Sequence, residues 1–193
     1  MTEPPSSITV PLGCGVTAEL PLTWIDEHLG VYSFVLVGEV DWVRACATSL
    51  AEAIDDALDG EHVDIILTPE AKAITLAYEL SVRMSLPEFI VARKSRKPYM
   101  TDPVHVPVKS ITALEEEQLW FGKKAVDRLR GKRILIVDDV VSSGATMEAL
   151  FAFLGSIECE VVLVACVLTE GEERHEFDGI PLVNLAHIPL AHR

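Results

Sequence analysis

The sequence predicts an α/β fold in which a parallel, doubly wound sheet forms the centre of a single domain. Short segments with the apolar composition of buried strands alternate along the chain with segments whose apolar residues recur at helical spacing. The chain has 193 residues, of which 49% are hydrophobic and 24% are charged. This length and composition are sufficient for one domain with its own core.

The N-terminal half is expected to alternate strands with helices. Its clearest helical segment has apolar residues at positions 43, 47, 50, 54 and 58, followed by Gly60 as a stop signal. The expected elements of this half are short strands at 8–11 and 17–22 around a turn at 13–15, a helix at 41–58, a strand at 63–67, a helix at 72–84 and a strand at 88–92.

The second half begins with a segment of a different kind, at 95–122. Turn residues, a short alternation at 104–108 and an acidic run at 115–117 indicate either a β-ribbon or a mobile excursion. The remaining expected elements are a helix at 123–129, a strand at 134–137, a helix at 147–154, a strand at 160–167 and an irregular tail at 171–193 with an apolar run at 180–185.

Residues 134–146 form the most informative pattern in the chain, Ile-Leu-Ile-Val-Asp-Asp-Val-Val-Ser-Ser-Gly-Ala-Thr. The pattern predicts a buried strand, two acids at its C-terminal tip, a small hydroxyl-rich loop and the start of a helix. A helix start offers unpaired N–H groups and a positive dipole end to an anion, while carboxylates accept hydrogen bonds from hydroxyls. A ligand that carries both a vicinal diol and a phosphate is a phosphorylated ribose.

The acidic pair also has a simpler explanation, because acidic residues are common where a chain enters a helix. Adjacent like charges are unfavourable, however, unless a ligand or a cation uses them. The loops after the expected strands at 63–67, 88–92 and 134–137 should meet at one edge of a parallel sheet, where ligands bind. These loops contain the following charged residues: Lys72, then Arg93, Lys94, Arg96 and Lys97, and finally Asp138 and Asp139.

The composition argues against several other classes of protein. The formal net charge of −14 disfavours nucleic acid as a partner, since duplex binding requires basic surfaces. No apolar run approaches the ~20 residues of a membrane span, and the N-terminus does not resemble a signal peptide. Four cysteines without a CxxC pair indicate core thiols in a reducing, cytoplasmic location, and the six histidines show no metal-binding spacing.

Residues 134–146 resemble, over their whole length, the 13-residue phosphoribosyl-pyrophosphate signature of the type I phosphoribosyltransferases. The segment Thr-Pro-Glu-Ala-Lys at 68–72 is similar to the pyrophosphate-binding loop of that family. Ala-Arg-Lys-Ser-Arg-Lys at 92–97 resembles the Ala-Arg-Lys-x-x-Lys stretch that opens the flexible loop of adenine-type members. The resemblance covers roughly 60–168, and it implies one domain over 1–193 with a hood at 1–40, a core at 41–168 and a flexible loop at 95–122.

The resemblance also implies roles for individual residues. Asp138 and Asp139 would hold the ribose hydroxyls, act as the catalytic acids and orient Mg²⁺ through the substrate, with no metal bound directly by the protein. The 5′-phosphate would lie in a loop formed by Ser142, Ser143, Gly144, Ala145 and Thr146. The pyrophosphate would be bound by Ala71, Lys72, Arg93, Lys94 and Lys97. Residues 95–120 would close as a lid, and one of Glu115, Glu116 and Glu117 could assist proton transfer unless the run is only a solvated acidic loop.

The acceptor base is less well defined than the sugar donor. Family members that act on 6-oxopurines usually place a lysine beyond the signature helix, and this chain has no lysine after Lys132. The Asp-Asp pair and the Ala-Arg-Lys-x-x-Lys stretch also favour adenine, although Val-Ser-Ser-Gly-Ala replaces the Ala-Thr-Gly-Gly that is usual in adenine-type members. Tyr32 and Phe34 are candidates to stack on a purine, and core packing is the alternative role for each of them.

The resemblance therefore predicts a purine salvage transferase, a homodimer that converts adenine and phosphoribosyl pyrophosphate to a nucleoside monophosphate and pyrophosphate. Hypoxanthine/guanine or xanthine phosphoribosyltransferase activity is the nearest alternative. A non-catalytic, phosphoribosyl-pyrophosphate-sensing regulator is a further alternative. A regulator predicts a basic N-terminal DNA-binding segment, and residues 1–36 contain neither Lys nor Arg.

Overall fold

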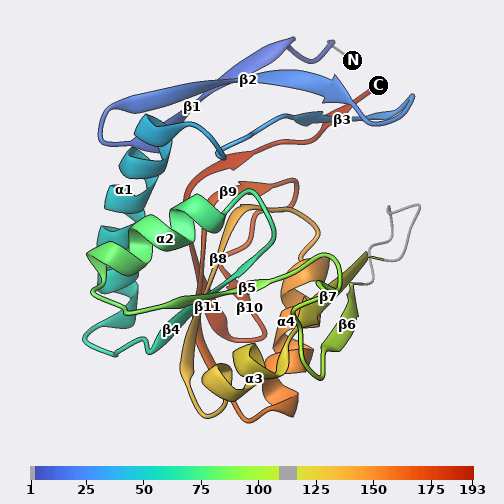
Figure 1. Cartoon of the computed structure of the whole chain (residues 1–193). Coiled ribbons are helices and arrows are strands. Elements are labelled where there is room, and N and C mark those ends of the chain that lie inside the picture. Colours follow the sequence, from blue (N-terminus) through green and yellow to red (C-terminus); the bar gives the residue numbers. More distant parts are fainter. Residues whose placement is uncertain (1–2, 109–116) are drawn as a thin grey trace.

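A central sheet organises the fold in the computed structural model, which describes residues 3–108 and 117–193. Six strands lie within these residues in the order β10-β11-β9-β8-β4-β5 (Figure 1). All neighbouring pairs are parallel except β10 and β11, which are antiparallel. The strands are β4 (Ile65–Pro69), β5 (Phe89–Ala92), β8 (Arg133–Val141), β9 (Glu160–Glu170), β10 (Glu176–Phe177) and β11 (Ile180–Ile188). The predicted parallel α/β architecture is confirmed.

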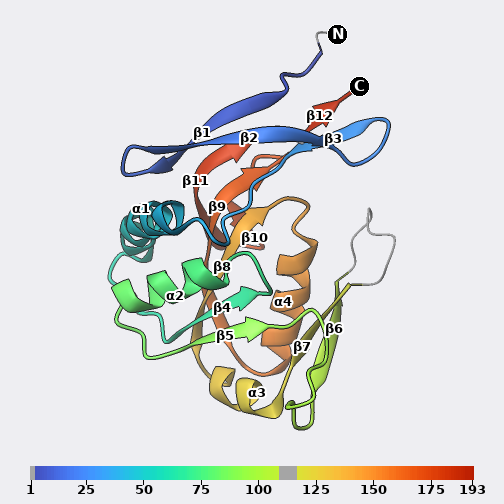
Figure 2. The same ribbon diagram turned by 45° about the horizontal axis from the view of Figure 1, so that its top comes forward.

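Helices cover both faces of this sheet (Figure 2). On one face, α1 (Val40–Leu58) and α2 (Ile74–Arg83) share a buried apolar cluster with Leu135 and Val137 of β8. On the other face, α3 (Lys123–Leu129) and α4 (Ala145–Ser156) pack with Ile134 and Ile136 of the same strand. Because neighbouring side chains of a strand point to opposite faces, β8 is buried on both sides and is apolar at every one of these positions.

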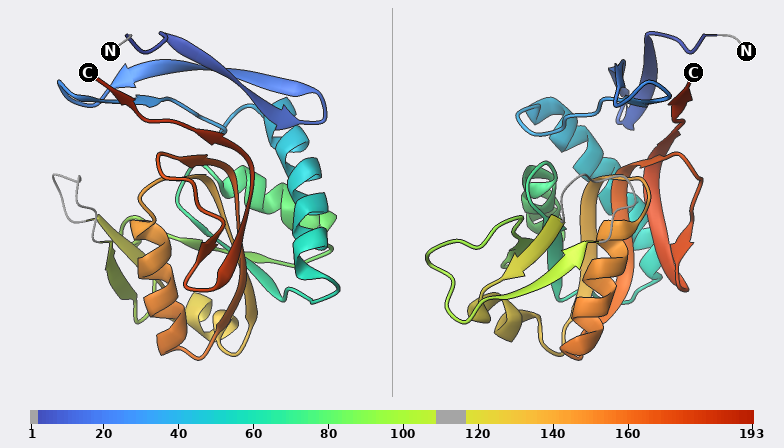
Figure 3. Two further views of the ribbon diagram at one scale, coloured as in Figure 1. Left: turned by 180° about the vertical axis from the view of Figure 1, so that it is seen from behind. Right: turned by 90° about the vertical axis from the view of Figure 1, so that its right-hand side faces the viewer.

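A second, antiparallel sheet lies at one end of the molecule and combines both ends of the chain (Figure 3). Its order is β1-β2-β3-β12, with β1 (Ser7–Gly13), β2 (Val16–Trp24), β3 (Leu29–Tyr32) and β12 (Ala191–His192). Apolar side chains of β1 and β2, among them Leu12 and Leu20, enter the same core cluster as α1. The guanidinium of Arg193 lies 3.8 Å from the ring centroid of Trp24, which attaches the C-terminus to β2.

The segment at 95–122 contains a two-stranded antiparallel ribbon of β6 (Val104–Val108) and β7 (Glu117–Phe121). Residues 109–116, between the two strands, lie outside the described residues. A backbone bridge joins the ribbon to the end of β5, because Arg93 and Trp120 exchange two hydrogen bonds of 3.0 and 2.7 Å. The ribbon is one of the two alternatives that the sequence left open, and its movement as a lid stays a prediction.

Two expectations about the chain are wrong. The strand predicted at 134–137 extends to Val141, so Asp138 and Asp139 lie within β8 and not after it, because pairing with β9 continues as far as Val141 and Thr169. The segment at 171–193 is not irregular, since it contains β10, β11 and β12. β11 pairs in parallel with β9, and β12 pairs with β3 near the other end of the chain. Neither pairing can be inferred from the local pattern of residues.

Replacement of Leu50 tests the core beneath the N-terminal sheet. Leu50 of α1 is fully buried, so Leu50→Ala should lower the free energy of unfolding by about 2–5 kcal/mol through lost apolar contact and a residual cavity. Urea denaturation followed by circular dichroism measures this loss. The exposed Glu52 on the same helix provides the control, because Glu52→Ala should change stability by less than ~0.5 kcal/mol. Equal effects of the two substitutions would contradict the assigned core.

Candidate functional site

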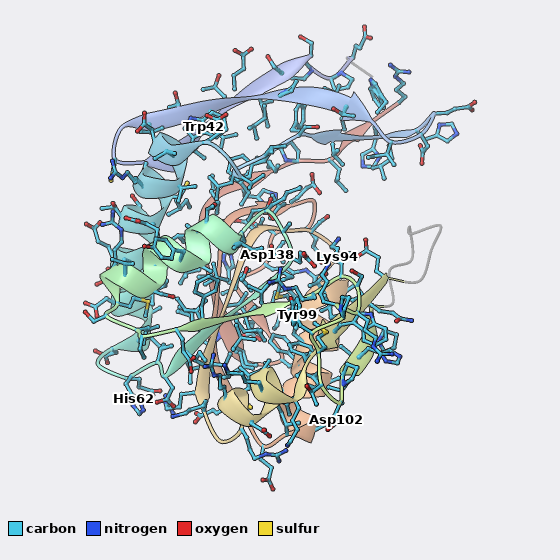
Figure 4. The ribbon with its side chains drawn as sticks, viewed as in Figure 1. Trp42, His62, Lys94, Tyr99, Asp102 and Asp138 are labelled. Atoms are coloured by element: carbon cyan, nitrogen blue, oxygen red, sulfur yellow. The ribbon has the colours of Figure 1, made fainter. Side chains whose placement is uncertain are left out.

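A pocket of about 520 Å³ lies at the C-terminal edge of the central sheet. It draws its walls from β4 and the turn after it, the segment after β5, the ribbon strand β7, the end of β8 and the start of α4. Figure 4 shows Asp138 and Lys94 at this edge, on the side of the central sheet that faces the antiparallel sheet β1-β2-β3-β12. The lining residues are Pro69, Glu70, Ala71, Lys72, Lys94, Ser95, Lys97, Glu117, Leu119, Asp138, Asp139 and Thr146.

The acidic pair of β8 forms the floor of this pocket. Asp139 is only 6% exposed, and its Oδ2 atom has no hydrogen-bond partner among the described residues. The Nζ atom of Lys72 faces this oxygen at 3.5 Å. The Oδ1 atom of Asp138 accepts a hydrogen bond of 2.8 Å from the backbone N–H of Asp139. A buried carboxylate oxygen without a donor is expensive, so this geometry indicates a site for hydroxyl or cationic ligands.

The environment of Asp138 disfavours its charged form. Burial raises the pKa of Asp138 well above its usual range, and the neighbouring charge of Asp139 raises it further. The backbone N–H of Asp139 and the charge of Lys72 act in the opposite direction without compensating for the burial. The raised pKa favours the protonated form of Asp138, and a protonated Asp138 does not repel the neighbouring carboxylate.

The turn after β4 brings a third carboxylate, Glu70, to the pocket. Glu70 accepts a hydrogen bond of 3.0 Å from the backbone N–H of Lys94 and one of 3.3 Å from Nη1 of Arg93, and Nζ of Lys97 lies 3.6 Å away. Burial by itself raises the pKa of Glu70, but these three donors outweigh it and lower the pKa below its usual range. Glu70 thus fixes the basic segment after β5 against the loop after β4.

The same pocket contains seven of the twelve residues predicted to bind the sugar donor, whereas Ser142, Ser143, Gly144 and Ala145 are not among its lining residues. Its walls include both acids of β8, Thr146, and four of the five residues expected to bind pyrophosphate: Ala71, Lys72, Lys94 and Lys97. Arg93 lies instead on a neighbouring pocket of about 430 Å³, from which its side chain reaches Glu70. Arg93 is therefore placed to support the pocket through Glu70, while the other four residues border it directly.

The loop at 142–146 turns the chain from β8 into α4. Gly144 occupies the N-cap of α4 with a φ of +86°, a left-handed conformation that favours glycine. A Cβ atom at this position would lie 2.7 Å from the ring of Phe177, so a side chain is also excluded by packing. The Oγ atom of Ser143 accepts a hydrogen bond of 3.4 Å from the N–H of Ala145. This tight turn places the positive end of the 12-residue α4 beside the acidic pair.

The two aromatic residues proposed to stack on a purine are core residues. Tyr32 and Phe34 are each only 3% exposed and belong to the apolar cluster beneath the N-terminal sheet. The Tyr32 hydroxyl donates a hydrogen bond to the backbone oxygen of Pro5, and the Phe34 ring stacks on Trp42 at 6.1 Å. This burial favours core packing, the alternative role for each ring, over stacking on a base; Tyr32 ends β3, and Phe34 follows it by two residues.

Three further carboxylates lie near the pocket: Glu70, Glu117 and Glu170. Of these, the sequence suggested a role only for Glu117, as one of three candidates to assist proton transfer. Glu70 was part of the recognised loop, yet only the tertiary structure shows its basic partners. Glu117 pairs with Lys94 at 3.2 Å, whereas Glu115 and Glu116 lie outside the described residues. Glu170 ends β9, beyond the predicted end of that strand. Burial raises the pKa of Glu170, while the Ser142 side chain and the charge of Lys72 oppose that rise.

Metal and membrane features can be stated for the described part of the chain. Within 3–108 and 117–193, no group of three or more His, Cys, Asp or Glu side chains is placed to hold a metal ion. No helix in the same residues is long and apolar enough to cross a membrane.

Comparison with known proteins places this fold and pocket in a family. Residues 41–188 match the family described as "Phosphoribosyl transferase domain". The chain therefore belongs to the phosphoribosyltransferases, an enzyme family, and its type I fold has the central sheet and small antiparallel sheet described above.

Individual relatives carry two kinds of name. The chain is 30% identical over 161 residues to "HGPRTase-like protein 3" of Haloterrigena turkmenica, a match that covers 81% of this chain and 82% of the relative. It is 32% identical over 129 residues to a hypoxanthine/guanine phosphoribosyltransferase of Methanothermus fervidus, covering 67% of this chain and 64% of the relative. The structure resembles an adenine phosphoribosyltransferase of Saccharomyces cerevisiae with a TM-score of 0.65 and 14% identity, covering 93% and 94% of the two chains.

The raised pKa of Asp138 predicts a characteristic pH dependence of stability. Because the folded state holds the protonated form more tightly than the unfolded state does, this group favours folding most at pH values below the ordinary carboxyl pKa. Its contribution is lost as the pH rises through the raised value. Asp138→Asn should therefore raise the melting temperature at pH 7 and lose that advantage in acid.

Thermal unfolding between pH 4 and pH 8 measures the effect of Asp138→Asn. Asp127→Asn is the matched control, because Asp127 is an exposed residue of α3 whose pair with Lys123 lies on the surface. A melting temperature of Asp138→Asn that falls below that of the parent at pH 7 would show that the acidic pair does not destabilise the fold.

Proposed function

We propose that this protein is a purine salvage phosphoribosyltransferase that transfers the phosphoribosyl group of phosphoribosyl pyrophosphate to a purine base, with adenine as the favoured base. The observation that supports this most directly is the buried Oδ2 atom of Asp139, which lacks a hydrogen-bond donor in the described structure and faces Lys72. A ribose hydroxyl would supply that donor, and the adjacent basic and helix-terminal groups suit the two phosphate-bearing ends of the donor.

The pocket supports an assignment of each part of the sugar donor. The ribose 2′- and 3′-hydroxyls lie on Asp138 and Asp139, and the 5′-phosphate lies in the loop at 142–146 at the start of α4. The pyrophosphate lies against Ala71 and Lys72 and is approached by Lys94 and Lys97 from the segment after β5. A volume of about 520 Å³ is within the range of small-molecule sites.

The reaction exchanges one bond at C1′ for another. A ring nitrogen of the base bonds to C1′ while the C1′–O bond to pyrophosphate breaks, and the electron pair of that bond leaves with the pyrophosphate. The proton on the base nitrogen passes to solvent or to a nearby carboxylate. Lys72 and Lys94 stabilise the negative charge that develops on the leaving group, and the acids of β8 favour the positive charge on the sugar.

Mg²⁺ fits this site, because it prefers oxygen ligands, keeps several waters and is commonly bound through substrate phosphates, and the pocket would hold such a substrate beside two carboxylates. Asp138 and Asp139 would hold it through the ribose hydroxyls, and when bound it would neutralise charge on the leaving pyrophosphate. The lid proposed for 95–120 would exclude water from the sugar. The ion pair of Lys94 with Glu117 connects the pyrophosphate side of the pocket to that segment.

Two observations bear on the base. The lack of lysine after Lys132 favours adenine, because a cationic donor to a 6-oxo group is then missing from the expected place. The relative from Methanothermus fervidus is named for hypoxanthine and guanine, which makes these bases the second candidates. A non-catalytic sensor of phosphoribosyl pyrophosphate is a third possibility, distinguished by binding without turnover. We also propose that the protein is a cytoplasmic homodimer, and light scattering tests this by measuring its molar mass in solution.

Turnover with separate bases tests the proposed activity. Purified protein is incubated with Mg²⁺, phosphoribosyl pyrophosphate and one of adenine, hypoxanthine, guanine, xanthine or orotate, and pyrophosphate release is measured. Adenine should give the highest kcat/KM and orotate none. Highest kcat/KM with a 6-oxopurine would move the assignment to the second candidates. Binding of phosphoribosyl pyrophosphate without turnover of any base would favour the sensor.

Replacement of Asp139 tests the ribose site. Asp139→Asn keeps the side-chain shape but removes the negative charge and replaces one of the two acceptor oxygens with an NH2 donor. The affinity for ribose 5-phosphate should therefore fall about 10- to 100-fold. Isothermal titration calorimetry measures the affinity, and circular dichroism checks that the fold survives. The surface variant Asp127→Asn should bind like the parent. Unchanged affinity of Asp139→Asn would show that the acidic pair does not hold the ribose.

A further inference from the structure

Arg174 lies on the segment that joins β9 to β10, far in sequence from the loop at 142–146 but next to it in space. Its Nη1 atom lies 3.1 Å from the place that a Cβ atom on Gly144 would occupy. The guanidinium also lies 5.3 Å from the ring centroid of Phe177, whose ring packs against Gly144 and, edge-on, against Phe151 of α4. Figure 2 shows β10 beside the upper part of α4, consistent with these contacts.

The hydrogen-bonding capacity of Arg174 is largely unused within the described structure. Its Nε atom is buried there and has no hydrogen-bond partner. Its carboxylate neighbour is Glu172, whose oxygen lies 3.6 Å from Nη2 and whose side chain is 82% exposed. An ion pair of this length and exposure contributes little. A guanidinium with a buried, unsatisfied N–H is costly unless a ligand accepts from it.

The distribution of basic residues around the pocket indicates which kind of ligand would accept a hydrogen bond from Arg174. The pyrophosphate end is bordered by Lys72, Lys94 and Lys97, whereas the loop at 142–146 contains no basic residue. A phosphate dianion at the start of α4 would otherwise be bound by backbone N–H groups and hydroxyls alone, in a protein of net charge −14. The planar fork of an arginine matches the oxygens of a phosphate, and Arg174 already borders the loop.

We propose that Arg174 is a phosphate-binding residue that contacts the 5′-phosphate of the phosphoribosyl group from the side of β10, across Gly144. This inference rests on the proposed function, because it assigns a residue to the same sugar-phosphate site. Gly144 is then required for two reasons: its left-handed backbone starts α4, and its lack of a side chain lets the guanidinium approach the loop.

The affinities of two anions, one for each end of the site, test this proposal. Calorimetric dissociation constants for ribose 5-phosphate and for pyrophosphate are measured on the parent, Arg174→Gln, Arg174→Lys and the control Glu172→Gln. Arg174→Gln should weaken ribose 5-phosphate about 10- to 100-fold, the effect of a lost charge-assisted hydrogen bond, and leave pyrophosphate within about twofold. Arg174→Lys should recover part of the loss, and Glu172→Gln should bind both anions like the parent.

Three results of these measurements would contradict the proposal, and they can be told apart. If Arg174 only supports Phe177 and the fold, Arg174→Gln lowers the melting temperature and weakens both anions alike, or changes neither affinity, and the proposal is overturned. Arg174→Lys that binds ribose 5-phosphate no better than Arg174→Gln also argues against a role for positive charge. A parent protein that fails to bind ribose 5-phosphate refutes the sugar-phosphate site itself, and with it both the proposed function and the role of Arg174.

Discussion

Two adjacent carboxylates within a strand that is paired on both sides are the constraint on which the candidate site depends. Asp138 and Asp139 border the same pocket, where burial raises the pKa of Asp138 and the neighbouring charge of Asp139 raises it further. The protein tolerates this because β8 is paired on both sides, with β4 and β9, and its preceding residues are apolar on both faces. The unfavourable burial is confined to these two side chains, whereas the apolar packing that stabilises β8 extends over both faces of the sheet.

The carboxylates of the pocket are paired with cations from the segments that follow β4 and β5. Lys72 faces Asp139, Lys97 and Arg93 face Glu70, and Lys94 faces Glu117. Most of these cations are at least partly exposed, so each pair is weak and can be replaced by a ligand that offers several anionic oxygens at once. A phosphorylated sugar would supply hydroxyl donors to the acids and anionic oxygens to the bases, which satisfies both sets together.

The family and the acceptor base rest on different kinds of evidence. The family is shown by the match of residues 41–188 to the phosphoribosyl transferase domain. The names of similar proteins point to two kinds of base: the yeast structure is named for adenine, and the relative from Methanothermus fervidus is named for hypoxanthine and guanine.

Local sequence was sufficient to determine the α/β class, the helices and the loop at 142–146, because apolar periodicity and turn residues are local signals. It also identified most of the residues that border the pocket. The extension of β8, the order of β10, β11 and β12, and the burial of Tyr32 were decided only by tertiary pairing, since a strand is stabilised by partners distant in sequence. The same holds for Glu70 and Arg174, whose importance follows from neighbours that no sequence spacing reveals.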